Sequence, residues 1–327
     1  MVKRTIIVLI TILFTGVVAS GCSSMGTQYH YGFIDKAGKF VIEAQYGNAL
    51  SFNEGLAGVM VGNGQYGKWG FIDIKGNVVI KEKYDRVRAF YEGLCPVRTG
   101  SEDTGVWTYI DKEGNTKIAT EYKDASVFVN GLAPVKFTKE GKYGYIDREG
   151  KTVIAPSFDI ASIFSEDLAL YGVGSSENLK TGFIGRDGKV VIEAKYAFCG
   201  SFSEGLSNVK LSGVQETADW GFIDKSGKPV IAPEYAWASS FSEGLAAVQI
   251  GDAKNGRWGY INKSGELVIE AGFGAARNFS EGLAAVQEGD AKTGKWGYID
   301  STGQFVIAPQ FNSAGDFAQG VAPASVE

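Results

Sequence analysis

The chain has 327 residues, with 45 glycines, 13% aromatic side chains, 7 prolines and a single histidine. A hydrophobic fraction of 44% excludes an intrinsically disordered chain, and a formal net charge of −5 offers nucleic acid no basic surface. Glycine and aromatic residues that are spread evenly indicate many short strands joined by tight turns. We therefore expect an all-β protein that has no nucleic-acid partner.

The first 21 residues have the three parts of a secretory signal peptide. Lys3 and Arg4 precede an apolar run at residues 6–14, which is shorter than the roughly 20 residues of a membrane-spanning helix. Small residues then precede Cys22, and this arrangement resembles the lipobox of bacterial lipoproteins. The resemblance implies cleavage before Cys22 and acylation of its thiol, so membrane lipid is an expected partner. The alternative is an ordinary signal peptide followed by a chance cysteine.

Residues 22–30 would then form a short lipidated tether in front of the folded domain. Ser23 follows the cysteine directly and resembles the outer-membrane sorting signal of Gram-negative bacteria. We expect a lipid-anchored protein of the cell envelope, located at the outer membrane if the host is Gram-negative.

Two sequence markers recur in step through the rest of the chain. The first is a Trp/Tyr-Gly-Phe/Tyr-Ile-Asp segment, whose copies begin at Tyr31, Trp69, Trp107, Tyr143, Thr181, Trp220, Trp258 and Trp296. The second is a Phe-x-Glu-Gly-Leu-Ala-x-Val segment, whose copies begin at Phe52, Phe90, Phe128, Phe164, Phe202, Phe241, Phe279 and Phe317. Eight copies of each marker define tandem repeats of about 38 residues over residues 31–327.

The Trp-Gly pair of the first marker is similar to that of the WG-repeat (KWG repeat) family. The pair is present at Trp69-Gly70, Trp220-Gly221, Trp258-Gly259 and Trp296-Gly297. Tyrosine replaces tryptophan at residues 31 and 143, threonine replaces glycine at residue 108, and the aromatic residue is missing at Thr181. The resemblance implies a repeat architecture and says little about activity, because the family is defined by its repeat.

One repeat, residues 258–295, contains three short strand patterns. Residues 258–262 form an aromatic, β-branched run that is typical of a strand, and an Asn-x-x-Gly turn leads from it to a second strand at residues 267–269. A third strand is predicted at residues 283–287, and a fourth is placed around Phe273. Units of three to four antiparallel strands arranged radially predict a β-propeller-like ring. An open β-solenoid is the alternative.

The phase of the repeats favours a closed ring. Each third strand is predicted to form a hairpin with the first strand of the next unit. The strand that begins at Tyr31 therefore lacks a predecessor, and the strand at residues 321–326 lacks a successor. The two can pair with each other only in a closed ring, and in an open array both would remain exposed edges.

The chemically reactive residue types do not form a recognisable catalytic or metal-binding set. His30 lies outside every repeat, so we expect an exposed tether side chain and no histidine-based active site or metal site. Cys95 and Cys199 occupy slots that other units fill with alanine, which predicts small buried groups. A disulfide between them is the alternative, and it would require a close approach that the sequence does not show. The repeated Asp and Glu residues indicate turns, and the loops at residues 251–256 and 289–294 indicate turns without calcium. We expect no cofactor and no metal.

The tryptophans and one variable slot are the remaining candidate binding residues. Five of the six tryptophans share one repeat slot, which favours a core position over a carbohydrate-binding platform. A second slot, two residues after the aromatic residue that follows the second strand, is variable, and it holds Ile160, Phe198 and Trp237 in three successive units. If this slot is exposed, the three side chains form an apolar contact site.

The sequence therefore predicts a protein that is not an enzyme. The favoured function is a membrane-anchored, non-catalytic binding or scaffold module for a protein or a polysaccharide. The alternatives are a glycan-active hydrolase or lyase built on a propeller, and a structural subunit of an envelope complex.

Overall fold

The structure is a computed structural model that describes residues 30–62, 66–175, 177–211, 219–290 and 292–326. The predicted signal peptide, Cys22 and most of the predicted tether lie outside the described residues. His30 was assigned to the tether as an exposed side chain. This assignment is wrong, because His30 is the half-buried first residue of strand β1 (His30–Asp35).

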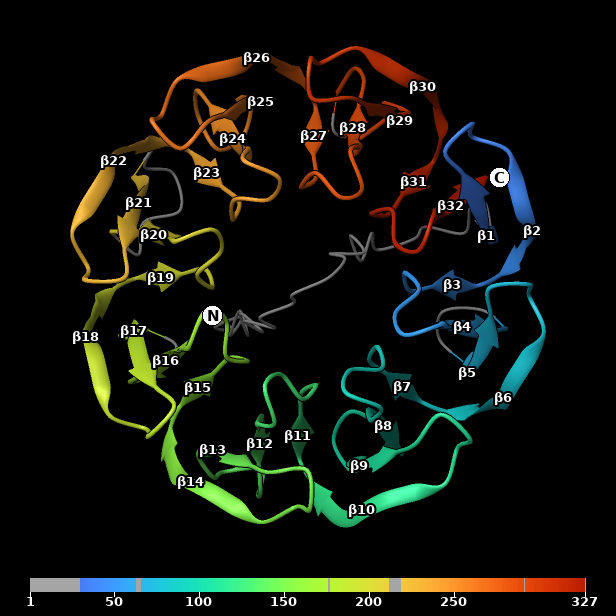
Figure 1. The fold of residues 1–327 in the computed structure, drawn as a ribbon, viewed down its shortest axis with the longest axis vertical. Coiled ribbons are helices and arrows are strands. Elements are labelled where there is room, and N and C mark those ends of the chain that lie inside the picture. Colours follow the sequence, from blue (N-terminus) through green and yellow to red (C-terminus); the bar gives the residue numbers. More distant parts are fainter. Residues whose placement is uncertain (1–29, 63–65, 176, 212–218, 291, 327) are drawn as a thin grey trace, which may run out of the picture.

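The described strands form eight antiparallel sheets of four strands each, arranged as blades around a central opening (Figure 1). The predicted β-propeller is therefore confirmed, and the open solenoid is excluded. Each blade also contains a two-residue strand on its inner edge, which the strand patterns of the sequence did not predict. The region around Phe273, where a fourth strand was placed, is instead the end of an outer strand.

The blades are numbered from the N-terminus, so that blade 1 begins with β3 and blade 8 begins with β31. The innermost strands are β3 (Asn48–Ala49), β7 (Arg86–Val87), β11 (Asp124–Ala125), β15 (Ile160–Ala161), β19 (Phe198–Cys199), β23 (Trp237–Ala238), β27 (Ala275–Ala276) and β31 (Ser313–Ala314). The second strands are β4 (Leu56–Val61), β8 (Cys95–Thr99), β12 (Ala133–Lys136), β16 (Leu168–Val173), β20 (Leu206–Lys210), β24 (Ala246–Ile250), β28 (Ala284–Gln287) and β32 (Val321–Val326).

The third strand of each blade carries the Trp-Gly marker, and the fourth strand lies on the outer circumference. The third strands are β5 (Lys68–Asp73), β9 (Val106–Ile110), β13 (Tyr143–Ile146), β17 (Lys180–Gly185), β21 (Trp220–Asp224), β25 (Arg257–Ile261), β29 (Trp296–Ile299) and β1 (His30–Asp35). The outer strands are β6 (Val78–Tyr84), β10 (Thr116–Tyr122), β14 (Thr152–Phe158), β18 (Val190–Tyr196), β22 (Pro229–Tyr235), β26 (Leu267–Phe273), β30 (Phe305–Phe311) and β2 (Phe40–Tyr46).

Blade 8 closes the ring with strands from both ends of the described chain. Its strand order is β2-β1-β32-β31, and β1 pairs with β32 from His30–Val326 to Asp35–Val321 (Figure 1). The predicted pairing of the two orphan strands is confirmed. Closure removes the exposed edges that an open array would leave at its first and last units.

The hydrophobic core lies between the blades. Eight clusters of buried residues fill the eight junctions, and each cluster takes its members from two neighbouring blades. At every junction the phenylalanine of the second marker packs against an aromatic ring of the preceding blade, with centroids 4.6–5.0 Å apart. A single repeat therefore cannot bury its own apolar side chains, and its stability depends on its neighbours.

The antiparallel pairing sorts the sequence features onto two rims of the ring. In blade 6, Trp237 pairs with Gln249, Gln249 with Trp258, and Trp258 with Phe273, so these residues lie at one rim. We call this the aromatic rim. The Phe-x-Glu-Gly loops and the Asp-x-x-Gly turns connect the strands at the opposite rim, which we call the glutamate rim.

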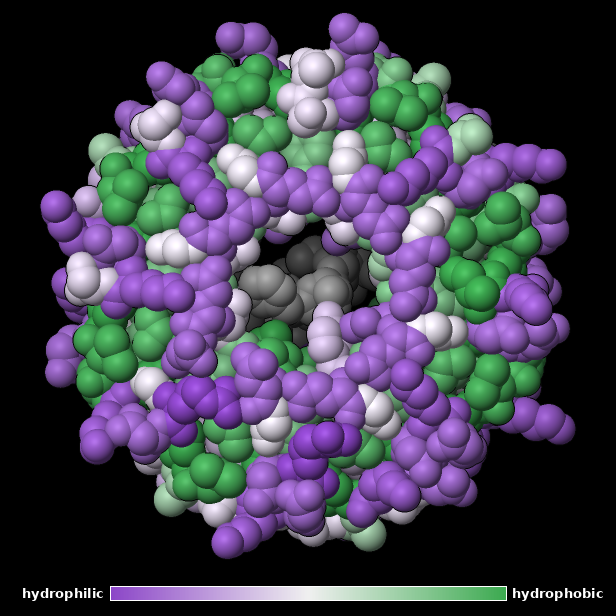
Figure 2. Space-filling view, in the orientation of Figure 1, coloured by the Kyte–Doolittle hydropathy of each residue, from purple (hydrophilic) through white to green (hydrophobic). Residues whose placement is uncertain are grey.

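The face of the ring seen in Figure 2 is hydrophilic around the central opening. Farther out, groups of hydrophobic residues alternate with hydrophilic residues that reach the circumference. Among the described residues there is no helix of the length and apolarity that a membrane span requires.

Candidate binding surface

The variable slot identified in the sequence is the first residue of each innermost strand, at the aromatic rim. Trp237 is 48% exposed there, while Phe198 and Ile160 are half-buried. The second residue of most innermost strands is small and buried, as Ala238 is after Trp237. Only the first residue of the strand therefore points toward the rim. The variable slot can be a contact site only where it is exposed, and Trp237 is the most exposed of the three residues.

Phe198 and Trp237 are brought together by a third aromatic residue, Trp220. The ring centroids of Phe198 and Trp220 are 5.5 Å apart, and those of Trp220 and Trp237 are 4.9 Å apart. Trp220 is only 2% exposed, so it forms the floor on which the other two rings rest. Ile160 packs against the core between blades 4 and 5. The three predicted residues thus lie on successive blades, and Phe198 and Trp237 form one continuous aromatic cluster with Trp220.

An ion pair lies beside these aromatic rings. The Lys210 Nζ atom is 2.9 Å from a carboxylate oxygen of Asp219, and the two side chains are 10% and 15% exposed. The same ammonium lies 5.9 Å from the centroid of the Trp220 ring. A largely desolvated ion pair adds little net stability, because the cost of removing two charges from water offsets their attraction. We call Phe198, Trp220, Trp237, Lys210 and Asp219 together the aromatic site.

Sequence reasoning missed three members of the aromatic site. Trp220 was assigned to the core, which is correct for its burial but overlooks that it supports Phe198 and Trp237. The signal available for Lys210 and Asp219 was weak, because each is one charged residue at the edge of a variable loop. The other tryptophans of the repeat slot are buried, as Trp107 is, or packed against the core clusters, which confirms the predicted core position.

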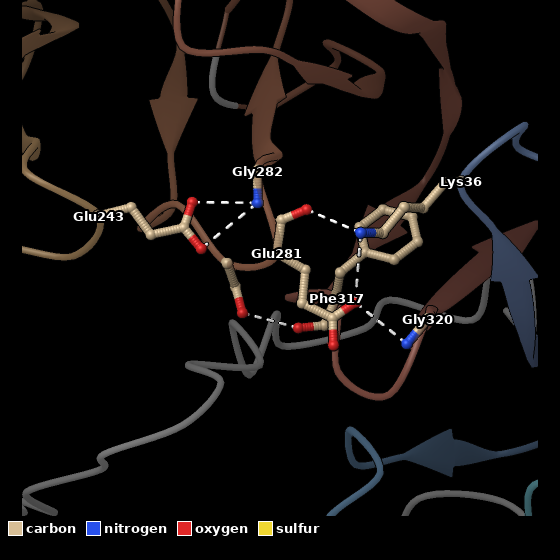
Figure 3. A network of polar contacts seen from close by, with 7 residues as sticks. Lys36, Glu243, Glu281, Gly282, Phe317 and Gly320 are labelled. Atoms are coloured by element: carbon tan, nitrogen blue, oxygen red, sulfur yellow. Dashed lines mark hydrogen bonds and ion pairs between the residues drawn. The ribbon is translucent and has the colours of Figure 1, made fainter.

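The glutamates of the second marker form a ring of contacts at the glutamate rim. Each carboxylate accepts a hydrogen bond from the N–H of the marker glycine in the next blade, as Glu243 does from Gly282 at 3.0 Å (Figure 3). The pairs are Glu54–Gly93, Glu92–Gly131, Glu166–Gly205, Glu204–Gly244, Glu243–Gly282 and Glu281–Gly320, and Gln319 acts in the same way on Gly55. Turn chemistry alone therefore does not explain these acids, since they also join the blades.

Lysines reinforce four of these glutamates. Lys36 lies 3.4 Å from Glu281 and also donates to the Glu281 carbonyl oxygen (Figure 3). The equivalent ion pairs are Lys112–Glu54, Lys225–Glu166 and Lys263–Glu204. At the junction where Gln319 replaces the glutamate, Ile74 replaces the lysine. The charge is therefore absent from both partners at that junction.

The pKa of Glu204 reflects these contacts. Burial opposes ionisation, but hydrogen bonds from Lys263 and from the Gly244 N–H outweigh it, so the pKa lies below the usual value of 4.5. The carboxylate therefore adds stability that is present above about pH 4.5 and is lost as the pH falls through the lower pKa of the folded state.

We expect Glu204→Gln to lower the free energy of unfolding at neutral pH by less than about 1 kcal/mol, because the pair with Lys263 is partly exposed. The difference from the parent protein should shrink as the pH falls below about 4.5 and vanish below the lower pKa of the folded state. Urea denaturation at several pH values measures it. Gln319→Glu is the matched control, since Ile74 offers the new carboxylate no cation. An equal pH dependence in parent and Glu204→Gln protein would contradict the assignment.

The remaining sequence candidates have structural roles. The Asp35 side chain accepts hydrogen bonds from the N–H groups of Ala37 and Lys39, as predicted for the turns. Cys95 and Cys199 are free and buried, as predicted, and burial raises the pKa of the Cys199 thiol to about 12. Asp252 caps its own loop by accepting from the N–H groups of Lys254 and Asn255. Within the described ranges, no three His, Cys, Asp or Glu side chains gather as metal ligands would.

The repeat is recognised along almost the whole described chain. The WG containing repeat matches residues 31–66, 69–101, 107–143, 143–174, 182–214, 220–252, 258–290 and 296–327. The chain belongs to the WG containing repeat family. No curated protein matches this WG-repeat chain.

Solved structures share the fold of this WG-repeat protein at low sequence identity. The chain is similar to a eukaryotic initiation factor, with 8% identity, a TM-score of 0.52, and 84% of this chain and 89% of that chain covered. It is similar to the β-propeller domain of the Trilobed protease from Pyrococcus furiosus, with 11% identity, a TM-score of 0.51 and coverage of 86% and 99%. It is also similar to prolyl oligopeptidase B from Galerina marginata, with 10% identity, a TM-score of 0.56 and coverage of 86% and 50%. These likenesses show the fold alone.

Proposed function

We propose that this WG-repeat protein is a non-catalytic binding module of the cell envelope, held at a membrane by acyl chains on Cys22, and that it binds an envelope protein or glycan at the aromatic site. The observation that carries the proposal is a half-exposed tryptophan, Trp237, packed against a buried one, Trp220, at the rim of a closed ring. Exposed aromatic residues on a rigid floor are favoured anchors for partners, because little side-chain freedom is lost on binding.

The placement of the site also supports binding. The aromatic site spans the junction of blades 5 and 6, and half-buried Ile160 on blade 4 extends the apolar surface along the rim. In contrast, the repeated acids are engaged in turns and blade junctions. A glycan hydrolase commonly uses two carboxylates with different environments at one place, and the acids described so far are committed to structural contacts.

The anchor is proposed on sequence grounds. Its test is the mass of the N-terminal peptide of the mature protein, which should begin at an acylated Cys22.

We expect Trp237→Ala to weaken partner binding by about 30-fold or more, since a central aromatic anchor contributes about 2 kcal/mol or more. The full-length protein in detergent is incubated with peptidoglycan, with surface polysaccharide and with solubilised envelope proteins, and the retained material is measured. Retention by a glycan identifies a glycan-binding module, and capture of one protein identifies an assembly subunit.

Tyr66→Ala is the matched control for this experiment. Tyr66 is an aromatic residue that is 77% exposed in the loop between β4 and β5 of blade 1, also at the aromatic rim. Its replacement should leave binding unchanged. Equal binding by the parent, Trp237→Ala and Phe198→Ala proteins, with all three folded, would overturn the proposed role of the aromatic site.

A further inference from the structure

The wall of the central channel contains a cavity at the closing blade that none of the repeat features explains. Its volume is about 300 Å³, and its lining comes from blades 7, 8, 1 and 2. The innermost strands of these blades, β27, β31, β3 and β7, follow one another along the inner circumference in Figure 1. We call this space the seam cavity.

Asp316 is the unusual residue of the seam cavity. It occupies the slot directly before the marker phenylalanine, and the other seven units fill that slot with neutral residues, which are Ser51, Ala89, Val127, Ile163, Ser201, Ser240 and Asn278. The repeat fold therefore does not require a carboxyl group at this position. A charge that departs from a repeated pattern is free to serve a ligand.

One oxygen of Asp316 is left without a partner. The Oδ1 atom is buried and receives no hydrogen bond from the described residues. Burial raises the pKa of the carboxyl group above its usual value, and the nearby Arg277 charge opposes that rise only in part. An unsatisfied buried acceptor costs free energy, which a ligand hydroxyl would recover once the carboxyl group turns toward the cavity.

The rest of the lining offers both donors and acceptors. Arg277 provides a guanidinium, and Asn53 and Tyr91 provide an amide and a phenol whose side chains hydrogen-bond to each other. Leu50 and Ala89 contribute apolar surface. The two ionised side chains in the lining have opposite charges, so the site favours neither a cation nor an anion.

We propose that the seam cavity binds a single neutral sugar residue, either free or at the end of a glycan, through a hydroxyl that donates to the Asp316 carboxylate. A polyhydroxylated ring both donates and accepts hydrogen bonds and has apolar faces, which matches the lining. The volume lies at the small end of the range for ligand pockets, which fits one sugar ring. Asp316 is the only carboxylate in the described lining, so the cavity has one half of the usual hydrolytic pair and is suited to binding. The site is separate from the aromatic site.

The test measures sugar binding by the full-length protein in a detergent without a sugar headgroup. Glucose, galactose, mannose and N-acetylglucosamine are titrated at millimolar concentration, and calorimetry or ligand-observed NMR reports binding. We expect at least one sugar to bind, Asp316→Asn to weaken it by about tenfold or more because a charged acceptor is lost, and Ala89→Trp to abolish it by filling the cavity. Asp103→Asn, at an 85% exposed aspartate, should have no effect.

A thermal melt shows that each variant is folded. Asp316→Asn should melt no lower than the parent at neutral pH, because the raised pKa means that the buried carboxylate costs stability there. The proposal would be overturned if none of the four sugars binds. It would also be overturned if the folded Asp316→Asn and Ala89→Trp proteins bind a sugar as tightly as the parent does. Sugar binding that is weakened by Trp237→Ala but unchanged in Asp316→Asn and Ala89→Trp would belong to the aromatic site and would overturn the seam-cavity assignment, so failure at one site is distinguishable from failure at the other.

Discussion

Removal of β32, by ending the chain after Gly320, is expected to lower the melting temperature by more than about 10 °C or to prevent folding. The truncation takes away the partner of β1 along six residue pairs, from His30–Val326 to Asp35–Val321. It also removes Val321 from the core between blades 8 and 1, and two alanines from the core between blades 7 and 8. The loss therefore affects two junctions at once.

A closed ring and an open array respond differently to this truncation. In an open array the last unit has a single neighbour, so its loss would leave the other units nearly as stable as before. Thermal melting of the parent and truncated proteins distinguishes the two cases. A melting temperature within a few degrees of the parent's would contradict closure through blade 8.

The opposite change gives the matched control. His30 and Val326 lie opposite each other at the seam, so replacing both with cysteine allows a disulfide that locks the ring. The oxidised double variant is expected to be more stable than its reduced form by about 2–4 kcal/mol, because the cross-link restricts the unfolded chain. The oxidised and reduced forms have the same sequence, so a difference in their stability reports the cross-link at the seam and not the substitutions.

Ring closure could be predicted from the sequence, because it depends on the phase of the repeats. The two markers fix which strand of a unit pairs with the next unit, and the orphan strands at residues 31–34 and 321–326 follow from that phase. The innermost strands were harder to find. Each is only two residues long, too short for an alternating pattern, and it is defined by its pairing with the second strand.

The role of the marker glutamates could not be predicted, because it is a contact between units. Glu204 and Gly244 are 40 residues apart in the chain, and only the ring brings the carboxylate to the N–H group. The unusual backbone of the glutamate, with a φ of 55°, gave no sequence signal either, since the left-handed region favours glycine or asparagine. In contrast, Asp316 could have been found by the comparison of units that identified Ile160, Phe198 and Trp237, applied to a neighbouring slot.

The glycine of the Trp-Gly pair has a stricter role than a turn residue. In blade 6, Trp258 pairs with Phe273 and Tyr260 with Ile269, so two residues of β25 span four residues of β26 in a β-bulge. The bulge brings the outer strand onto Gly259, where an added β-carbon would lie 2.5 Å from the Ile269 carbonyl oxygen and 2.9 Å from the Ala271 nitrogen. The same approach to a carbonyl oxygen, at 2.3–2.7 Å, recurs at Gly32, Gly70, Gly144, Gly182, Gly221 and Gly297.

We expect Gly259→Ala to lower the free energy of unfolding by about 1–3 kcal/mol, because backbone atoms on both strands must move to admit the methyl group. Chemical denaturation of the full-length protein measures the change. Gly272→Ala is the matched control, since this glycine lies in β26 of the same blade with open space around it, and the same substitution there should be neutral or stabilising by up to about 1 kcal/mol. Thr108 shows that blade 2 accepts a β-carbon at this slot, so Thr108→Gly should destabilise by at most about 1 kcal/mol, through backbone entropy alone. Equal effects of Gly259→Ala and Gly272→Ala would contradict the steric role assigned to Gly259.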